Sequence, residues 1–438
     1  MKVRSLSVLR RPVTGAVAGQ VTQALAGLVL QVAAARFLGA AGLATFALGY
    51  GLVVLATAVC SGLVGDSLTV LDRGDERTRA GLHGWAALVS TAAAVLGAAA
   101  ALATGVLPVW AGLLLGLATA VFIVEDTLRR LLMATGRFWS LPAVDGGSLL
   151  LSLATLVALR IDGELTVASF VVAVLVGQTG ASLVAWWRLP DAERPRGPWR
   201  NPALRTVFAF GVWRAAAQTI RPTLLTVVRV VVVAVAGAAA YGPIEAARVL
   251  TAPTLVLVAG LGSFLLPHFV ALRDRPVSDT LRKADRVAAG LAVGVALIGA
   301  AICLLLPWLG PLLAGGQYEV PLPAVAGWSA YAVAGAVLLP YSALATVHRQ
   351  QRRVLLLRSL EFAGLAAVVV MVITVESGAQ WAPLGLAVGP VLAAAAVRGL
   401  ILAPAAQGRP DRVARAGAVV GQRLPRALRN APRKGQRP

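Results

Sequence analysis

Residues 14–35 read TGAVAGQVTQALAGLVLQVAAA, a run of 22 residues that contains no charged side chain. A helix needs about 20 mostly apolar residues to cross the roughly 30 Å hydrocarbon core of a bilayer. Four basic residues precede this run, as in a secretory signal, but the apolar core of a signal is only about 7–15 residues long. We therefore predict a first transmembrane helix here.

The whole chain has the composition of an integral membrane protein. Of its 438 residues, 58% are hydrophobic and 13% are charged, and the mean hydropathy is +0.79. Soluble domains carry about 25% charged residues. The net charge of +21 would suit nucleic acid only if it formed a polar basic face, whereas long apolar stretches separate these arginines. We therefore expect membrane lipid, and no nucleic acid, as a partner.

The same length criterion predicts twelve membrane-spanning helices. Irregular backbone does not face lipid, and the strands of a membrane barrel would show alternation that is missing here, so we expect an all-α fold. The predicted spans are 13–36, 42–65, 82–104, 108–128, 142–160, 165–187, 206–238, 242–270, 287–309, 322–346, 354–375 and 381–404.

Positive charges set the expected orientation. Of the 40 lysines and arginines, 33 fall in the N-terminal head, in every second loop and in the C-terminal tail. Cytoplasmic loops carry the excess of such residues. This alternation predicts a multi-pass protein of the cytoplasmic membrane with both termini cytoplasmic.

A basic, proline-rich linker divides the spans into six and six. Gly42 and Gly242 each follow a short alanine-rich outer turn, and their offset of 200 residues favours a parallel internal duplication. The expected units are an N-terminal six-helix lobe (1–187), the linker (188–205), a C-terminal six-helix lobe (206–404) and a basic cytoplasmic tail that we expect to be disordered (405–438).

Charges inside the spans are the first candidates for function. An arginine at mid-bilayer costs about 2.5–3.5 kcal/mol on insertion scales, so it usually faces a bundle interior or a water-filled cavity. At 100° per residue, four polar residues of the seventh span share one face of about 80°. The eighth span adds a further arginine, so we predict a cationic substrate-binding wall. Its residues are Arg214, Gln218, Arg221, Arg229 and Arg248.

Some of these charges have a structural alternative. Arg214 lies near the cytoplasmic end, where it could snorkel, and Arg248 could pair with Glu245 one turn earlier. Arg221 and Arg229 have no acid in their own helix, so they are the stronger candidates for a polar cavity.

The first span carries a neutral polar stripe. Gln20, Gln23 and Gln31 lie on one side of the helix and complete the predicted substrate site, with hydrogen bonding between helices as the alternative. Elsewhere we expect Glu125 to pair with Arg129 one turn later, merely holding a helix end.

No catalytic or metal-binding pattern is present in the sequence. There is no phosphate-binding glycine loop and no nucleophile elbow. Cys60 and Cys303 lie in apolar stretches, and His83, His268 and His348 show no ligand spacing. We therefore expect no enzyme, no catalytic residue, no metal and no cofactor.

Short motifs connect the two halves to a known family. The first half carries Arg36-Phe37-Leu38-Gly39 with Gly42 three positions on, and the second carries Tyr241-Gly242, Glu245-Ala246-Ala247-Arg248 and Leu265-Leu266-Pro267. With the twelve spans and the central basic linker, these motifs resemble the polysaccharide-flippase branch of the multidrug/oligosaccharidyl-lipid/polysaccharide exporter superfamily. The resemblance implies two six-helix lobes around a central cavity.

Members of that branch flip polyprenyl-pyrophosphate-linked oligosaccharides to the outer leaflet by alternating access. The resemblance therefore implies a lipid-linked sugar as substrate, held through its pyrophosphate by the arginines, with a polysaccharide polymerase or glycosyltransferases as further partners.

Three alternatives stay open. Drug antiporters of the same superfamily bind their coupling cation on acids in the N-terminal lobe, whereas positions 12–36 contain no Asp or Glu. We favour the flippase for that reason. Lipid II flippases have two more helices, and a non-transporting membrane scaffold would not need the intramembrane arginines.

Overall fold

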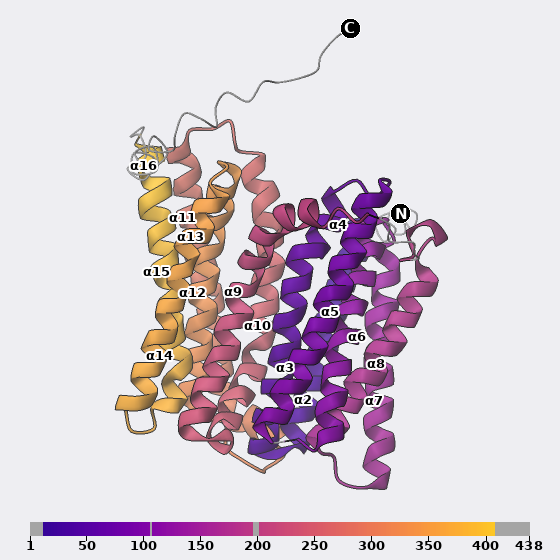
Figure 1. The fold of residues 1–438 in the computed structure, drawn as a ribbon. Helices are drawn as coiled ribbons and strands as arrows, with labels where there is room; N and C mark the ends of the chain where they lie inside the picture. Colours follow the sequence, from indigo (N-terminus) through magenta and orange to yellow (C-terminus); the bar gives the residue numbers. More distant parts are fainter. Residues whose placement is uncertain (1–11, 106, 196–200, 408–438) are drawn as a thin grey trace, which may run out of the picture.

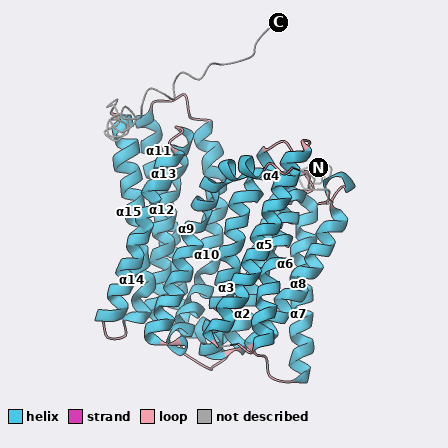
Figure 2. Cartoon of the chain, in the orientation of Figure 1, coloured by secondary structure: helices cyan, strands magenta, loops and turns pink. Residues whose placement is uncertain are grey.

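The computed structural model describes residues 12–105, 107–195 and 201–407. Within these ranges the chain is all-helical and forms no strand, which confirms the predicted fold class (Figure 2). Eleven helices of the described chain are long and apolar enough to cross a membrane. The predicted basic head, residues 196–200 of the linker and the tail from 408 onward lie outside the described residues.

The helices form two lobes, as predicted (Figure 1). The first lobe contains α2 (Pro12–Phe37), α3 (Gly39–Cys60), α4 (Asp66–Val70), α5 (Glu76–Thr104), α6 (Val109–Ala134), α7 (Leu141–Asp162) and α8 (Val167–Arg188). The second contains α9 (Leu204–Ala236), α10 (Ala238–Val270), α11 (Val277–Ala314), α12 (Leu322–Val347), α13 (Gln351–Arg358), α14 (Ala363–Thr374), α15 (Ala382–Ala396) and α16 (Ala403–Ala406). The exact lobe and linker boundaries remain predictions.

Local capping explains several helix ends. Asp75 accepts a hydrogen bond from the Thr78 amide (2.9 Å) at the start of α5, and its bonds to Thr78 lower the pKa of the Asp75 carboxyl. At the other end, Gly105 adopts a left-handed conformation with φ of +62°. A reciprocal box between Thr166 and Ser169 begins α8.

Three predicted spans are less regular than expected. The second contains a π-helical turn at Ser61–Gly65, the last contains another at Val397–Leu402, and the eleventh is broken by a 3-10 turn at Ser359–Phe362. The first break lies where α9 approaches closely, because a Cβ at Gly62 would lie 2.3 Å from the Cα of Ala215. The long seventh span, in contrast, is one continuous helix across Pro222.

At the predicted outer end the two lobes are in direct contact. Tyr318 donates to the carbonyl of Ala35 (2.8 Å), Gln317 donates to that of Arg36 (2.9 Å), and Arg36 donates to the carbonyl of Leu312 (2.6 Å). A Cβ at Gly242 would lie only 2.0 Å from the carbonyl oxygen of Ala40. The path between the lobes is therefore closed at this end.

Candidate functional site

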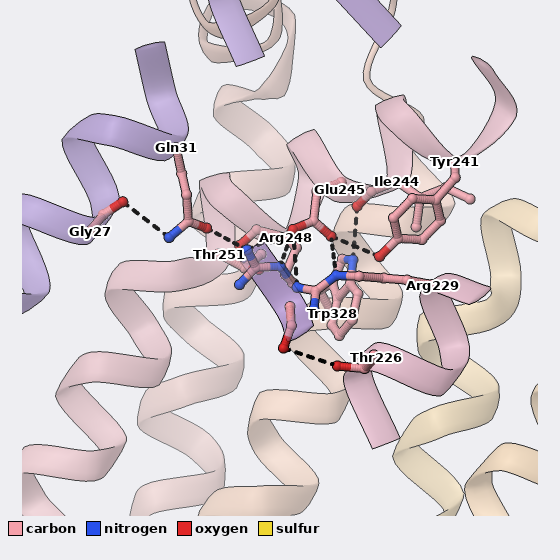
Figure 3. A network of polar contacts seen from close by, with 11 residues as sticks. Gly27, Gln31, Thr226, Arg229, Tyr241, Ile244, Glu245, Arg248, Thr251 and Trp328 are labelled. Atoms are coloured by element: carbon pink, nitrogen blue, oxygen red, sulfur yellow. Dashed lines mark hydrogen bonds and ion pairs between the residues drawn. The ribbon is translucent and has the colours of Figure 1, made fainter. Parts of the chain in front are cut away.

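A buried network of polar side chains lies where α9 and α10 meet α2 and α3 (Figure 3). At its centre Glu245 is only 2% exposed. Its carboxylate accepts hydrogen bonds from Arg229 Nη2 (3.2 Å), Arg248 Nε (2.8 Å) and Tyr241 Oη (2.7 Å). The Arg248–Glu245 pair, which the sequence offers as a structural alternative for Arg248, is present.

The same network crosses from one lobe to the other. Arg248 Nη2 donates to the side-chain oxygen of Gln31, which belongs to α2 of the first lobe. On the opposite side of the network Thr226 Oγ1 donates to the carbonyl of Gly51 on α3 (3.4 Å). A Cβ at Gly51 would lie 2.5 Å from Arg229 Nη1, so the glycine provides the space that the guanidinium occupies.

Next to this network lies a cavity of about 360 Å³ between the lobes, which we call the interlobe cavity. Three arginines line it, and Glu245 is bonded to two of them, so two formal positive charges remain. Arg221 forms no ion pair among the described residues, and its guanidinium lies 5.8 Å from the ring centroid of Tyr331. The polar lining residues are Gln23, Gln31, Tyr50, Arg221, Arg229 and Arg248.

A second cavity of about 430 Å³ lies inside the first lobe, and we call it the N-lobe cavity. Gln23, Gly27, Tyr50 and Val54 line both cavities, so the two adjoin. The N-lobe cavity has the opposite chemical character, because carboxylates dominate its charged lining. Its polar residues are Gln20, Gln23, Tyr50, Thr57, Ser61, Glu125, Asp126, Arg130, Asp145, Ser148, Ser152, Gln178 and Gln218.

Two carboxylates of the N-lobe cavity have cationic partners. Asp126 accepts from Arg130 Nε (2.8 Å) and from Ser61 Oγ (2.6 Å). Asp145 accepts from Arg129 Nε at 3.1 and 3.3 Å through its two oxygens. The predicted Glu125–Arg129 pair is therefore wrong. Arg129 binds Asp145 on the neighbouring helix α7, and the sequence of one helix cannot indicate a partner on another.

Glu125 is the exception among these acids. It is 4% exposed, it forms no ion pair among the described residues, and its buried Oε1 has no hydrogen-bond partner. Gln178, which lines the same cavity, also has an unpartnered buried Oε1. Burying an ionised carboxylate without a partner is costly, so this position is suited to binding a proton or another cation.

The structure divides the predicted site residues between the two cavities. Gln20 and Gln218 line the N-lobe cavity, Gln23 lines both, and Gln31, Arg221, Arg229 and Arg248 line the interlobe cavity. Gln218 also donates to Asp66 (3.0 Å). Arg214 lines neither cavity; it lies 3.8 Å from Asp66 and 4.2 Å from the Phe210 ring centroid.

Sequence reasoning missed Glu125, Asp126, Asp145 and the acid that neutralises Arg229. The adjacent pair Glu125-Asp126 inside an apolar run was the available signal, since two acids in a span are costly. No group of three or more His, Cys, Asp or Glu residues suited to a metal ion occurs in the described part of the chain.

Comparison with known proteins shows the fold. No protein-family model matches the chain, and no curated protein matches it significantly. It is similar to an outward-facing multidrug resistance MATE family transporter of the MOP superfamily (TM-score 0.58, 15% identity, 91% of this chain and 97% of that one). A eukaryotic MATE transporter is similar at 0.60 and 12% (93% and 98%), and a MATE in the straight conformation at 0.54 and 16% (88% and 93%). The chain therefore has the two-lobed fold of MATE transporters.

Proposed function

We propose that this chain is a cation-coupled antiporter that moves its cargo across the cytoplasmic membrane by alternating access, with Glu125 as the carboxylate that takes the coupling cation. One observation carries the proposal: Glu125 is a buried acid without a cationic partner, and it lines a cavity that adjoins the space between the lobes. The similarity to a multidrug resistance MATE transporter supports it.

This proposal replaces the flippase as the first choice. Positions 12–36 contain no Asp or Glu, which by itself would disfavour an antiporter. The fold brings Glu125, Asp126 and Asp145 from α6 and α7 to the cavity that Gln20 and Gln23 line from α2. An acid in the first helix is therefore not needed to place carboxylates at this point.

The geometry suggests how a cation and a cargo could compete. A proton or a cationic solute bound at Glu125 would neutralise the one carboxylate of the N-lobe cavity that has no basic partner among the described residues, so both would favour the same position. Exchange then follows if the lobes rock between inward-open and outward-open states, with the outer contacts at Ala35 and Arg36 broken in the latter.

Proteoliposomes with an acidic interior and radiolabelled tetraphenylphosphonium as the cationic probe test this proposal. The wild type should accumulate the probe, and Glu125→Gln should lose gradient-driven uptake. Glu164→Gln, at an exposed glutamate in the turn before α8, is the matched control and should keep it. Equal uptake by Glu125→Gln and the wild type would remove Glu125 from the mechanism.

A second candidate keeps a specific observation in its favour. The interlobe cavity retains two positive charges, and Arg221 has no ion pair among the residues that the structure describes. Arginine forks match phosphate oxygens well, so a polyprenyl-pyrophosphate-linked oligosaccharide would suit this cavity. A polymerase or glycosyltransferases would then be partners.

A flipping assay separates the two candidates. The probe is a fluorescent polyprenyl-pyrophosphate disaccharide in vesicles, read out by quenching from outside. Arg221→Ala should abolish flipping if the flippase holds, whereas Arg273→Ala, at an exposed arginine between α10 and α11, should not. If the wild type does not flip the lipid but shows gradient-driven uptake of the phosphonium, only the antiporter remains as a candidate.

A further inference from the structure

A long apolar groove runs along the flank of the second lobe, away from both cavities described above. Its volume is about 960 Å³. α12 forms its floor, and α11 and α15 form its walls, since α12 packs against both of these helices. Several wall residues, among them Ala296, Ala300, Val391 and Ala395, are exposed, so the groove opens toward the lipid.

The groove owes its depth to small side chains. α11 approaches α12 so closely that a Cβ at Gly299 would lie 2.6 Å from the Cβ of Ser329. From Ala326 to Tyr341 the floor covers 16 residues, a rise of about 22 Å at 1.5 Å per residue. One leaflet contributes roughly 15 Å of the 30 Å hydrocarbon core, so the groove can hold a lipid chain over the full depth of a leaflet.

An ion pair lies at the end of the groove nearer the predicted cytoplasmic side. Arg398 donates to both oxygens of Asp285, with Nε–Oδ1 at 2.8 Å and Nη2–Oδ2 at 2.9 Å. Tyr341 Oη donates to the same carboxylate at 2.9 Å. The side chains of Arg398 and Asp285 are 46% and 32% exposed, so both charges are accessible from outside the lobe.

The length of α11 allows this pair to lie at the depth of the headgroups. α11 has 38 residues, about 57 Å, and is much longer than the hydrocarbon core. Asp285 lies eight residues after the start of α11 at Val277, about 12 Å along it. A pair exposed to this extent would be costly among hydrocarbon chains, whereas headgroups and water satisfy it.

We propose that the groove holds one glycerophospholipid of the cytoplasmic leaflet whose headgroup carries both a phosphate and a primary amine, as phosphatidylethanolamine does. Its chain fills the groove, its phosphate binds Arg398, whose Nη1 is not used in the pair with Asp285, and its ammonium group binds Asp285. Two adjacent, opposite protein charges complement a zwitterionic headgroup. A headgroup with a phosphate and no amine would leave that phosphate close to Asp285 without a compensating cation.

Native mass spectrometry of the full-length protein, with added phosphatidylethanolamine or phosphatidylglycerol, tests the proposal. The wild type should retain the ethanolamine lipid roughly tenfold better, the scale of one charge-assisted hydrogen bond. Arg398→Gln should weaken binding of both lipids, and Asp285→Asn should abolish the preference between them. Equal retention of the two lipids by the wild type would overturn the proposal.

A second pair of variants leaves the ion pair intact and so separates lipid binding from stability. Ala300→Phe fills the groove, and Ala301→Phe places the same ring on the neighbouring exposed position outside it. Ala300→Phe should lose the lipid at an unchanged melting temperature, and Ala301→Phe should keep it. Undiminished retention by Ala300→Phe would show that the chain does not lie in the groove.

Discussion

Arg229 on α9 and Glu245 on α10 form a buried ion pair, with 3.2 Å between Nη2 and Oε1 and side chains only 7% and 2% exposed. Tyr241 and Arg248 complete the shell around the same carboxylate. Glu245 therefore holds two arginines of the interlobe cavity in place, which makes it part of the structure that shapes any cargo site there.

Removing this carboxylate should destabilise the protein strongly. Glu245→Gln keeps the size of the side chain but leaves Arg229 buried without a negative partner, and breaking a buried pair in this way costs about 3–5 kcal/mol. Thermal unfolding in detergent should show the loss. Asp279→Asn, which breaks an exposed pair with Arg282, should change stability little. Similar melting temperatures for the two variants would contradict this account.

The glycine beside Arg229 gives a finer test of the same network. In Gly51→Ala the new Cβ would meet Arg229 Nη1 at 2.5 Å, so the guanidinium must leave the position in which it is bonded to Glu245. Overpacking of this kind costs about 1–3 kcal/mol. Gly335→Ala on α12, where no atom lies within 4 Å of the new Cβ, should instead be neutral or stabilising. Gly51→Ala should therefore melt at a lower temperature than Gly335→Ala, and the opposite order would contradict the close contact between Gly51 and Arg229.

Tyr318 should help to close the outer end. Its bond to the Ala35 carbonyl joins the lobes, and Tyr318→Phe should cost about 0.5–1.5 kcal/mol in the closed state. Burial raises the pKa of the Tyr318 phenol above its ordinary value, so this contribution is complete below pH 10 and declines only at higher pH, as the phenol loses its proton. The difference in unfolding free energy between wild type and variant should therefore shrink as the pH rises past 10. A difference that grows with pH would contradict this role.

The fold was largely predictable from the sequence because spans and basic loops are local patterns. The length of each apolar run located the helices. The alternation of basic and non-basic loops constrained how many spans there are. Interruptions such as the turn at Ser61–Gly65 were not predictable, because they depend on contact with α9 from the other half of the chain. The residues around position 62 do not by themselves indicate that contact.

The candidate site was predictable only in part, for the same reason. The helical wheel of α9 placed four polar residues on one face, and two of them, Arg221 and Arg229, line the interlobe cavity. Gln218 lines the N-lobe cavity and Arg214 lines neither. The partners of those residues, in contrast, come from other helices: Glu245 for Arg229, and Asp66 for Gln218. The net charge of each cavity, and with it the choice of cargo, depends on these long-range pairs.

Measurements of stability should separate a paired, structural acid of the N-lobe cavity from the acid proposed to work in transport. Asp145 is 5% exposed and is paired with Arg129, so Asp145→Asn leaves a buried arginine uncompensated and should cost about 3–5 kcal/mol. Glu125 is buried to a similar extent but has no such partner, so Glu125→Gln should leave the melting temperature unchanged or raise it. Uptake of tetraphenylphosphonium should be lost in Glu125→Gln although that protein is stable.

The double variant Arg129→Met/Asp145→Leu, which removes both charges of the pair, should recover most of the stability lost in Asp145→Asn. A Glu125→Gln protein as unstable as Asp145→Asn would mean that Glu125 holds the lobe together and is not free to bind a cation.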